Sequence, residues 1–288
     1  MKWYYRKGKF MAGTLYLVAT PIGNMEDMTY RAVRILNEVD LIACEDTRTS
    51  RKLLDHFDIH TPTTSYHEFN KIEKAAVLLR KLEEGQNLAV ITDAGAPGIS
   101  DPGEELVQMC YEEGINVSAI PGATASIVAV TSSGQKCRRF SFEAFLPKDK
   151  KERRRVLEEM ERETRTLIVY EAPHHLKDTL KELYGVLGNR DITLCRELTK
   201  KFEEHQKTTL EGAMEYYSTN EPRGEYVLVI AGKTKEEVEA EATAKWESLS
   251  IDEHMQMYLD EGMDKKAAMK AVAKDRGVSK RDIYNALL

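Results

Sequence analysis

The sequence predicts an α/β protein made of two α/β domains, followed by a small helical module. Short apolar runs alternate with amphipathic stretches along most of the 288 residues, which is typical of strands and helices that build covered sheets. Glycine and proline residues follow several of the apolar runs, where a strand has to turn into a helix.

The first domain is expected over residues 13–134. Strands are predicted at 15–19, 41–44, 88–92 and 117–120, and helices at 29–37, 49–57, 71–84, 104–113 and 124–133. Because these strands are apolar throughout and do not alternate, they predict a mainly parallel sheet that is covered on both faces.

The second domain is expected over residues 135–234 and contains a second, mixed sheet. Its predicted strands are 140–145, 167–170, 192–196 and 226–231, with helices at 151–163, 175–187 and near 211–217.

Residues 235–248 are polar and rich in Glu and Ala, which indicates an acidic connector. Residues 1–12 form an N-terminal extension, either a lead-in or an extra edge segment. This extension is aromatic and basic, and it lacks the apolar stretch of a secretory signal.

The predicted C-terminal module, residues 249–288, carries several helix signals. Ser250 with Glu253 fits a capping box, Gly262 fits the position after a helix, and Asp264 can cap the next helix. Ser279 with Asp282 can open a third helix. The pattern resembles a helix-turn-helix module that binds nucleic acid. A three-helix docking bundle with solvated lysines is the alternative interpretation.

Composition limits the class of protein. The hydrophobic content of 42% is enough for buried cores, and no apolar run approaches the ~20 residues that cross a bilayer. Four scattered cysteines without a CxxC pair indicate neither a zinc site nor disulfides, so reduced thiols in a cytoplasmic protein are expected. The net charge of −6 argues at first against nucleic acid, but the charges are segregated along the chain.

Basic residues gather at residues 148–155 and in the C-terminal segment 264–288. Residues 148–155 read KDKKERRR, six basic against two acidic. Cations at a helix start oppose its dipole, which is easier to explain if phosphate neutralises them, although a solvated helix start is the alternative. The residues predicted to bind RNA are Lys148, Lys150, Lys151, Arg153, Arg154, Lys280 and Arg281.

Three turns follow strands of the first domain. They are TPIGN at 20–24, DAGAPGISDPG at 93–103 and PGATAS at 121–126. Small residues let a ligand approach the backbone, and the carboxyl ends of strands in open α/β sheets are where ligands bind. None of the turns matches the phosphate-binding GxxxxGK[ST] or the dinucleotide GxGxxG pattern, so neither a nucleoside triphosphate nor NAD is the first expectation.

Together with CEDTR at 44–48 and SYHEFN at 65–70, these turns occur in the order found in the tetrapyrrole-methylase superfamily, and the chain resembles that family. Within it, the chain is most similar to bacterial 16S rRNA ribose 2'-O-methyltransferases. The resemblance covers residues 13–232 and continues into the C-terminal segment. It implies a class III methyltransferase with S-adenosylmethionine in a cleft between two α/β domains. It also implies a homodimer that modifies a cytidine in the decoding centre of the small subunit.

The resemblance also implies which residues contact the cofactor. They are small, apolar or wall-forming residues of the three turns and of one second-domain strand end: Ile22, Gly23, Ala94, Gly95, Ala96, Ile99, Thr124, Ala125, Tyr170 and Glu171.

Transfer of a methyl group to a ribose hydroxyl needs an aligned acceptor and a group that takes its proton. Asp93, Asp46 and His67 are the candidates, and Arg48 is the neighbouring cation. Each has a structural alternative: Asp93 can brace its loop, Asp46 can cap the helix expected from residue 49, and Arg48 can pair with either acid. The chemistry requires no metal.

Two other functions are compatible with these patterns. One is a small-molecule methylase that acts on a tetrapyrrole, although a compact macrocycle needs neither the basic patches nor the helical tail. The other is a non-catalytic RNA-binding assembly factor, although such a protein has no need for turns that admit a ligand to the backbone.

Overall fold

The computed structural model describes residues 12–247 and 249–288, so the extension predicted at 1–12 lies almost entirely outside the described residues. The described residues form two compact units. The first ends at Ala231 and contains both sheets, whereas the second consists of Glu161–Thr164 and Gly232–Leu288. Neither 12–247 nor 249–288 contains a helix long and apolar enough to cross a membrane.

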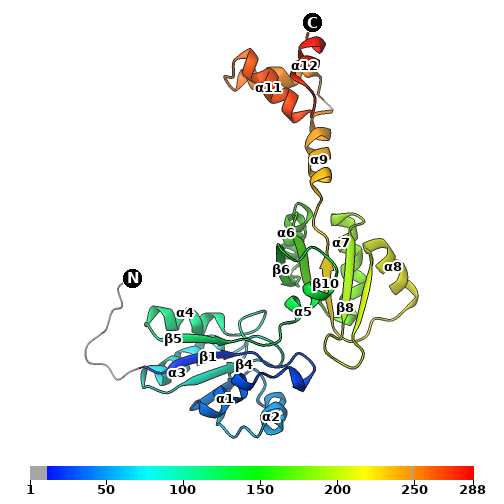
Figure 1. Ribbon diagram of the computed structural model, residues 1–288. Helices are drawn as coiled ribbons and strands as arrows, with labels where there is room; N and C mark the ends of the chain where they lie inside the picture. Colours follow the sequence, from blue (N-terminus) through cyan, green and yellow to red (C-terminus); the bar gives the residue numbers. More distant parts are fainter. Residues whose placement is uncertain (1–11, 248) are drawn as a thin grey trace. The chain divides into compact units, whose positions relative to one another are not determined.

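The first sheet has five parallel strands in the order β3-β2-β4-β1-β5 (Figure 1). The strands are β1 (Thr14–Val18), β2 (Leu41–Cys44), β3 (Thr63–Ser65), β4 (Leu88–Ile91) and β5 (Asn116–Ile120). The 3-10 turn η1 (Met25–Asp27) follows β1. The helices are α1 (Tyr30–Glu38), α2 (Thr47–His56), α3 (Lys71–Glu83), α4 (Glu104–Glu112) and α5 (Ala125–Ser132).

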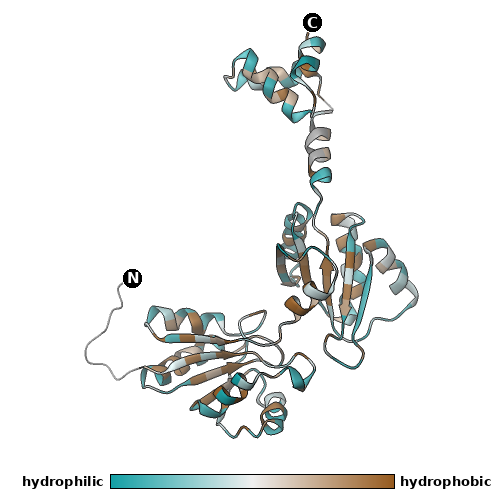
Figure 2. Cartoon of the chain, viewed as in Figure 1, coloured by the Kyte–Doolittle hydropathy of each residue, from teal (hydrophilic) through white to brown (hydrophobic). Residues whose placement is uncertain are grey.

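Helices cover both faces of this sheet, as the apolar strands predict. One core cluster joins Leu36 of α1 and Leu54 of α2 to the strands, and another joins Leu78 of α3 and Leu106 of α4 to the opposite face. Hydropathy colouring shows apolar strands between helices that are polar on their outer sides (Figure 2). A parallel sheet with both faces covered is the predicted arrangement, and it is confirmed.

The second sheet is mixed, in the order β6-β7-β10-β8-β9. Its strands are β6 (Phe140–Phe145), β7 (Thr166–Glu171), β8 (Asp191–Arg196), β9 (Glu204–Thr209) and β10 (Tyr226–Ile230). β6 pairs with β7 in parallel and the other pairs are antiparallel. The helices α6 (Lys150–Glu161), α7 (Pro173–Leu187) and α8 (Leu210–Thr219) pack on one face.

The other face of the second sheet is covered by α5, which directly follows the last strand of the first sheet. Ala129 and Val130 of α5 share a core cluster with Ile168 and Val229 of the second sheet. This helix therefore connects the two sheets by packing as well as by sequence.

Three elements differ from the sequence predictions. β3 has only three residues, too few for a hydrophobic pattern, and β9 is an edge strand with the polar sequence EHQKTT. The segment predicted as an acidic connector forms the helix α9 (Lys235–Glu247), and this helix was not predicted. Its Glu, Ala and Lys residues are good helix formers, but the segment has no apolar stripe to reveal a helix.

The second unit ends in three short helices, α10 (Ile251–Asp260), α11 (Lys265–Asp275) and α12 (Lys280–Ala286). The predicted caps are confirmed: Ser250 and Glu253 form a capping box, Asp264 caps α11, and Ser279 with Asp282 forms a second capping box. Gly262 follows α10 with φ 89°, the left-handed conformation that glycine adopts readily. Met255, Val272 and Ile283 form the small core of these helices.

Candidate cofactor pocket and charged surfaces

The strand order places the three predicted turns side by side. β1 lies between β4 and β5, and because all three strands are parallel, their carboxyl ends meet at one edge of the sheet. The chain leaves β1 toward β2 on one side and leaves β4 toward β5 on the other. The turns after β1 and β4 therefore flank the switch point where α/β sheets bind ligands.

Backbone contacts hold these turns together. Thr20 and Gly95 exchange two backbone hydrogen bonds, with N···O distances of 2.9 and 3.1 Å, which join the turn after β1 to the long loop after β4. Gly122, in the turn after β5, lies so close to Ala19 that an added Cβ would come within 2.8 Å of the Ala19 Cβ. The three turns therefore converge at one edge of the first sheet.

These turns form one side of a pocket of about 330 Å³. From the first half of the chain it is lined by Ile22, Glu45, Asp93, Ala94, Gly95, Ala96, Ile99, Ser100, Asp101, Thr124 and Ala125. From the second sheet and its loops it is lined by Phe145, Tyr170, Glu171, Ala172, Cys195, Leu198, Lys200, Glu225, Tyr226 and Val227.

Of the residues predicted to contact a cofactor, all but Gly23 line this pocket. Gly23 lies beside it, against Lys200 and Thr199 of the connection between β8 and β9. The sequence reasoning missed Glu45, Ser100 and Asp101, which stand inside motifs already singled out. It also missed most of the second-sheet side, where no glycine or proline pattern gives a signal.

Aromatic side chains form part of the second-sheet wall. The hydroxyl oxygen of Tyr170 accepts a hydrogen bond from the backbone N–H of Ser126 at 3.0 Å, which fixes the ring against the start of α5. Phe142 and Phe145 pack edge to face on the Tyr170 ring, with centroids 5.0 and 5.6 Å away. Phe145 remains 57% exposed, so the pocket has an accessible aromatic edge.

The pocket is strongly acidic. Its lining contains the carboxylates of Glu45, Asp93, Asp101, Glu171 and Glu225. The one lysine or arginine in the lining, Lys200, is neutralised by Glu197 at 2.9 Å and by Glu225 at 2.7 Å. A pocket with this balance favours a cationic ligand over a phosphate-bearing one.

Burial raises the pKa of three of these carboxyl groups. Desolvation raises the pKa of Glu45 and of Asp93 above the ordinary values. Desolvation, together with the charges of Glu45 and Asp93, raises the pKa of Asp101 to about 7. Carboxyl groups that share a pocket oppose one another's ionisation, and among these three it is Asp101 whose pKa is raised close to neutrality.

The four predicted catalytic residues fall into different positions. Asp93 lines the pocket, and its carboxylate accepts a hydrogen bond from the Asp46 backbone N–H at 3.3 Å. Asp46 caps α2 and pairs with Arg48, whose guanidinium at 3.0 Å lowers the pKa of that carboxyl. Arg48 is 91% exposed. These are the structural roles that the sequence left open for Asp46 and Arg48.

His67 lies on the loop after β3 and does not line the pocket. Its Nε2 is 3.3 Å from the Asn70 side-chain nitrogen, and its Nδ1 is buried without a hydrogen-bond partner. Within the described parts of the chain, no group of three His, Cys, Asp or Glu side chains is placed to hold a metal ion.

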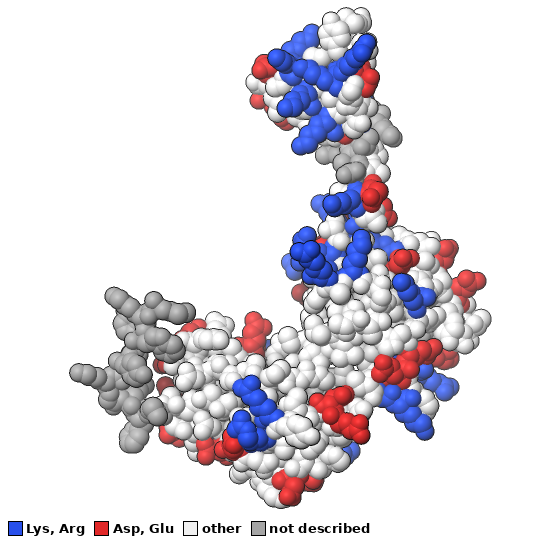
Figure 3. Space-filling view, in the orientation of Figure 1, with Lys and Arg blue, Asp and Glu red and all other residues white. Residues whose placement is uncertain are grey.

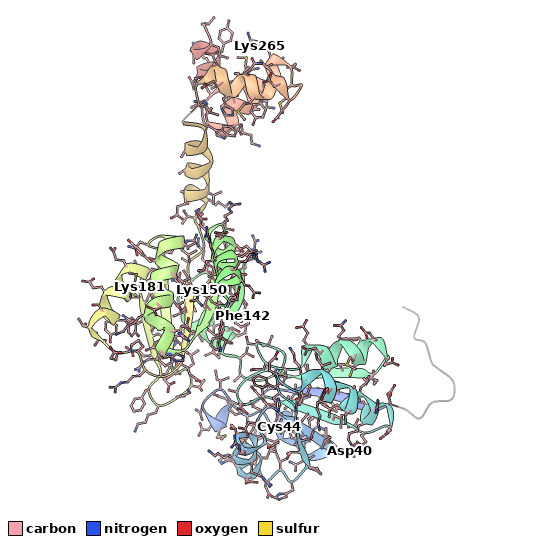
Figure 4. All side chains as sticks on the ribbon, turned by 180° about the vertical axis from the view of Figure 1, so that it is seen from behind. Asp40, Cys44, Phe142, Lys150, Lys181 and Lys265 are labelled. Atoms are coloured by element: carbon pink, nitrogen blue, oxygen red, sulfur yellow. The ribbon has the colours of Figure 1, made fainter. Side chains whose placement is uncertain are left out.

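The basic residues around α6 divide into two groups. Arg153 is 20% exposed and is bound within the fold, donating to Glu182 at 2.6 Å and to Thr179 at 2.8 Å. Arg154 pairs with Glu158 one helical turn away. Within residues 12–247 and 249–288, no ion pair involves Lys148, Lys150 or Lys151. Lys148 precedes α6, and Lys150, which is labelled in Figure 4, begins it together with Lys151. Figure 3 shows a cluster of Lys and Arg side chains over α6.

The second unit carries its own basic surface. Lys280 and Arg281 are exposed in the first turn of α12. Further lysines lie on α11, and Lys265 is labelled at its start in Figure 4. Figure 3 shows Lys and Arg side chains spread over this helical unit.

Comparisons with known proteins agree with this architecture. Residues 14–213 match the family model described as tetrapyrrole (corrin/porphyrin) methylases. The chain is 52% identical to Ribosomal RNA small subunit methyltransferase I of Halalkalibacterium halodurans, over 95% of this chain and 94% of that protein. It is 44% identical to the protein of the same name from Bacillus subtilis, over 97% and 95%.

Among solved structures, the fold is similar to that of uroporphyrin-III C-methyl transferase from Thermus thermophilus complexed with S-adenyl homocysteine. The TM-score is 0.54 at 20% identity, covering 76% of this chain and 97% of that one. The two α/β sheets predicted from the sequence thus form a known fold. The chain belongs to the tetrapyrrole methylase family and, within it, to the group of ribosomal RNA small subunit methyltransferase I proteins.

Proposed function

We propose that the protein is an S-adenosylmethionine-dependent methyltransferase of small-subunit ribosomal RNA. In its finer form, the proposal is 2'-O-methylation of a cytidine ribose in the decoding centre of 16S rRNA. The observation that carries the proposal is the acidic pocket built on three ligand-admitting turns, in a chain 52% identical to a named rRNA methyltransferase.

The pocket suits S-adenosylmethionine in size and charge. Its volume of about 330 Å³ is in the range of small-molecule sites. The donor carries a sulfonium and an ammonium group against one carboxylate, so an acidic lining compensates its net positive charge. Ala94, Gly95 and Ala96 leave their backbone open for contacts with the adenine and carboxylate of the donor.

S-adenosylmethionine supplies an electrophilic methyl group on sulfur. The residues of this chain have to bind the donor, exclude water and align a ribose hydroxyl with the methyl carbon. Ile22, Ile99 and Tyr170 supply apolar and aromatic surface for that purpose. Phe145 stands at the second-sheet side of the pocket, exposed and next to the basic start of α6.

The proposed RNA substrate rests on the relatives and on the second unit. The family model ends at residue 213, before the C-terminal helices. The similarity to the rRNA methyltransferase of Halalkalibacterium halodurans covers 95% of the chain and so includes most of those helices. Lys148, Lys150 and Lys151 of the first unit, and Lys280 and Arg281 of the second, are the proposed phosphate contacts.

The same family resemblance leads us to propose a homodimer that works in the cytoplasm, where the small ribosomal subunit is assembled. Sedimentation analysis should give twice the mass of one chain. A monomer at all concentrations tested would contradict the dimer and leave the proposed chemistry unaffected.

The decisive experiment is methyl transfer from labelled S-adenosylmethionine to small subunits that lack the modification, followed by mapping of 2'-O-methyl groups. Label at one cytidine is the expected result. Label on a porphyrinoid offered in parallel would indicate a tetrapyrrole methylase. Binding of small subunits without any binding of the donor, measured by calorimetry, would indicate a non-catalytic assembly factor.

A further inference from the structure

We infer that Phe202, together with Lys201, forms a platform on which an unpaired base of the substrate RNA stacks beside the pocket. The inference rests on the proposed function and adds an RNA contact that the two basic patches do not include. Both residues lie in the connection between β8 and β9, which also supplies Leu198 and Lys200 to the pocket lining. A nucleotide held there would lie next to the proposed donor site.

Phe202 is an apolar side chain that the fold leaves in solvent. The residue is 65% exposed, and none of the core clusters formed within 12–247 and 249–288 contains it. Single exposed apolar residues are common on protein surfaces, so exposure alone does not indicate a site. Phe202 is distinguished by the way its loop is held and by the charge that accompanies its ring.

Hydrogen bonds fix the connection that carries Phe202. The Lys200 ammonium donates to Glu197 at 2.9 Å and to Glu225 at 2.7 Å. The backbone N–H of Thr199 donates to the Glu203 carboxylate at 2.7 Å, which closes the tip of the turn. Glu197 and Thr199 have φ values of 51° and 65°, left-handed conformations that are uncommon for residues with a Cβ. Such a backbone persists where its surroundings determine it, so the tip stands on a preorganised support.

Lys201 adds a positive charge beside the ring. Its Nζ lies over the Phe202 ring, 5.6 Å from the centroid, within the ~6 Å range of a cation–π contact. No ion pair in the described ranges 12–247 and 249–288 involves Lys201, whereas the charge of Lys200 next to it is neutralised. This pair fits a nucleotide, since the ring can stack on a base while the ammonium contacts a neighbouring phosphate.

An exposed phenylalanine in the first half of the chain shows the difference. Phe69, on the loop before α3, is 97% exposed. The lysine nearest to it in sequence, Lys71, pairs with Glu68 at 2.9 Å and with Glu105 at 2.5 Å. That ammonium is not available to a phosphate, and the ammonium of Lys201 is.

The acidic lining of the pocket also favours a contact of this kind. Carboxylates at the pocket repel the phosphate backbone of RNA, so a strand has to be held there by stacking or by cations at the edge. Phe202 and Lys201 supply both. Proteins bind RNA mostly where bases are unstacked and can lie on aromatic side chains. Because every base has a face that can stack, the platform positions the strand and does not select its sequence.

The test replaces Phe202 by side chains with and without a ring. Phe202→Ala should weaken binding of unmodified small subunits by roughly 5- to 150-fold, the effect of losing one stacked base. Phe202→Trp should bind like the unaltered chain, whereas Phe202→Leu, which keeps apolar bulk without a ring, should resemble Phe202→Ala. Tyr111→Ala removes a 70% exposed ring on α4 and is the matched control, which should bind like the unaltered chain.

Two further readouts separate stacking from a general loss of binding. The indole of Phe202→Trp should lose fluorescence when small subunits are added, beyond any change in the unaltered chain, because a stacked base quenches it. Lys201→Ala should reduce the slope of log affinity against log salt by about 1. Every variant should bind S-adenosylmethionine within about 2-fold of the unaltered chain, because the hydrogen bonds of Lys200 and Thr199 that fix the loop remain.

Several results would overturn the inference and leave the proposed function intact. One is binding of small subunits by Phe202→Ala at the unaltered affinity, and another is full binding by Phe202→Leu. A loss of the dimer in Phe202→Ala, measured by sedimentation, would place the ring against a second copy of the chain. A matching loss of donor affinity would make the loop a wall of the pocket only. Failure of the unaltered chain to bind small subunits would overturn both the inference and the proposed function.

Discussion

Gly23 lies directly against the side chain of Lys200, so closely that a Cβ at position 23 would come within 2.4 Å of the Lys200 Cγ. Gly23 belongs to the turn after β1, and Lys200 belongs to the connection between β8 and β9. Lys200 cannot easily move away, because Glu197 and Glu225 hold its ammonium. This contact therefore links the loops of the two sheets beside the pocket.

The first prediction concerns this contact. Gly23→Ala should weaken S-adenosylmethionine binding by about 10-fold or more, because overpacking and a non-glycine residue at φ 153° each cost about 1–3 kcal/mol. Calorimetric titration measures the effect. Gly185→Ala is the matched control, since its added Cβ meets nothing within 4 Å in α7, and it should stabilise the fold by about 0.5–1 kcal/mol. Unchanged binding by Gly23→Ala would show that the loop contact does not shape the pocket.

The second prediction separates two neighbouring arginines. Arg153→Ala should reduce the free energy of unfolding by about 1.5–3 kcal/mol, because it breaks hydrogen bonds to Glu182 and Thr179 at a largely buried position. Arg154→Ala should cost less than about 0.5 kcal/mol, because its ion pair with Glu158 is exposed. Urea unfolding of both variants measures the difference. Equal losses would mean that the position of Arg153 within the fold has no energetic consequence.

The third prediction concerns the exposed lysines at the start of α6. The double change Lys150→Ala and Lys151→Ala should weaken binding to small subunits and reduce the slope of log affinity against log salt by about 1–2, with unfolding unchanged. Lys181→Ala, on α7, removes one exposed lysine charge elsewhere on the same unit and serves as the control. If Lys181→Ala lost as much affinity per removed charge as the double variant, the attraction would be nonspecific. Such a result would contradict a binding site at α6.

The fourth prediction concerns stability and pH. Because Asp101 has a pKa of about 7 in the fold, above its unfolded value, the unfolded chain loses this proton first as pH rises. The stability contributed by protonated Asp101 is therefore full below about pH 4 and is lost as the pH rises through 7. Asp101→Asn should melt about 2–4 °C above the unaltered chain at pH 8, with a smaller difference at pH 5. A difference independent of pH would contradict the shifted ionisation.

Much of the fold could be predicted from the sequence, because apolar strands and glycine turns are local signals. The convergence of the turns after β1, β4 and β5 follows once a parallel sheet is assumed. The polar edge strand β9 and the helix α9 could not be predicted in the same way. Neither has a hydrophobic period, since β9 is half solvated and α9 has no apolar stripe.

The candidate site could be predicted on one side only. Ala94, Gly95 and Thr124 stand in turns that the sequence marks clearly, whereas Lys200 and Glu225 stand in loops without such marks. In the run KDKKERRR, nothing distinguishes Arg153 from its neighbours. Only the packing of α6 beside α7 shows that Arg153 is bound to the protein and that the lysines before it are not.

The pocket takes residues from as early as Ile22 and as late as Val227. During synthesis on the ribosome, its last wall, β10, leaves the exit tunnel only after nearly the whole first unit has been made. We therefore expect a nascent chain to be unable to retain the proposed methyl donor until translation has passed that strand. A newly made molecule then becomes competent only while its C-terminal helices are being added.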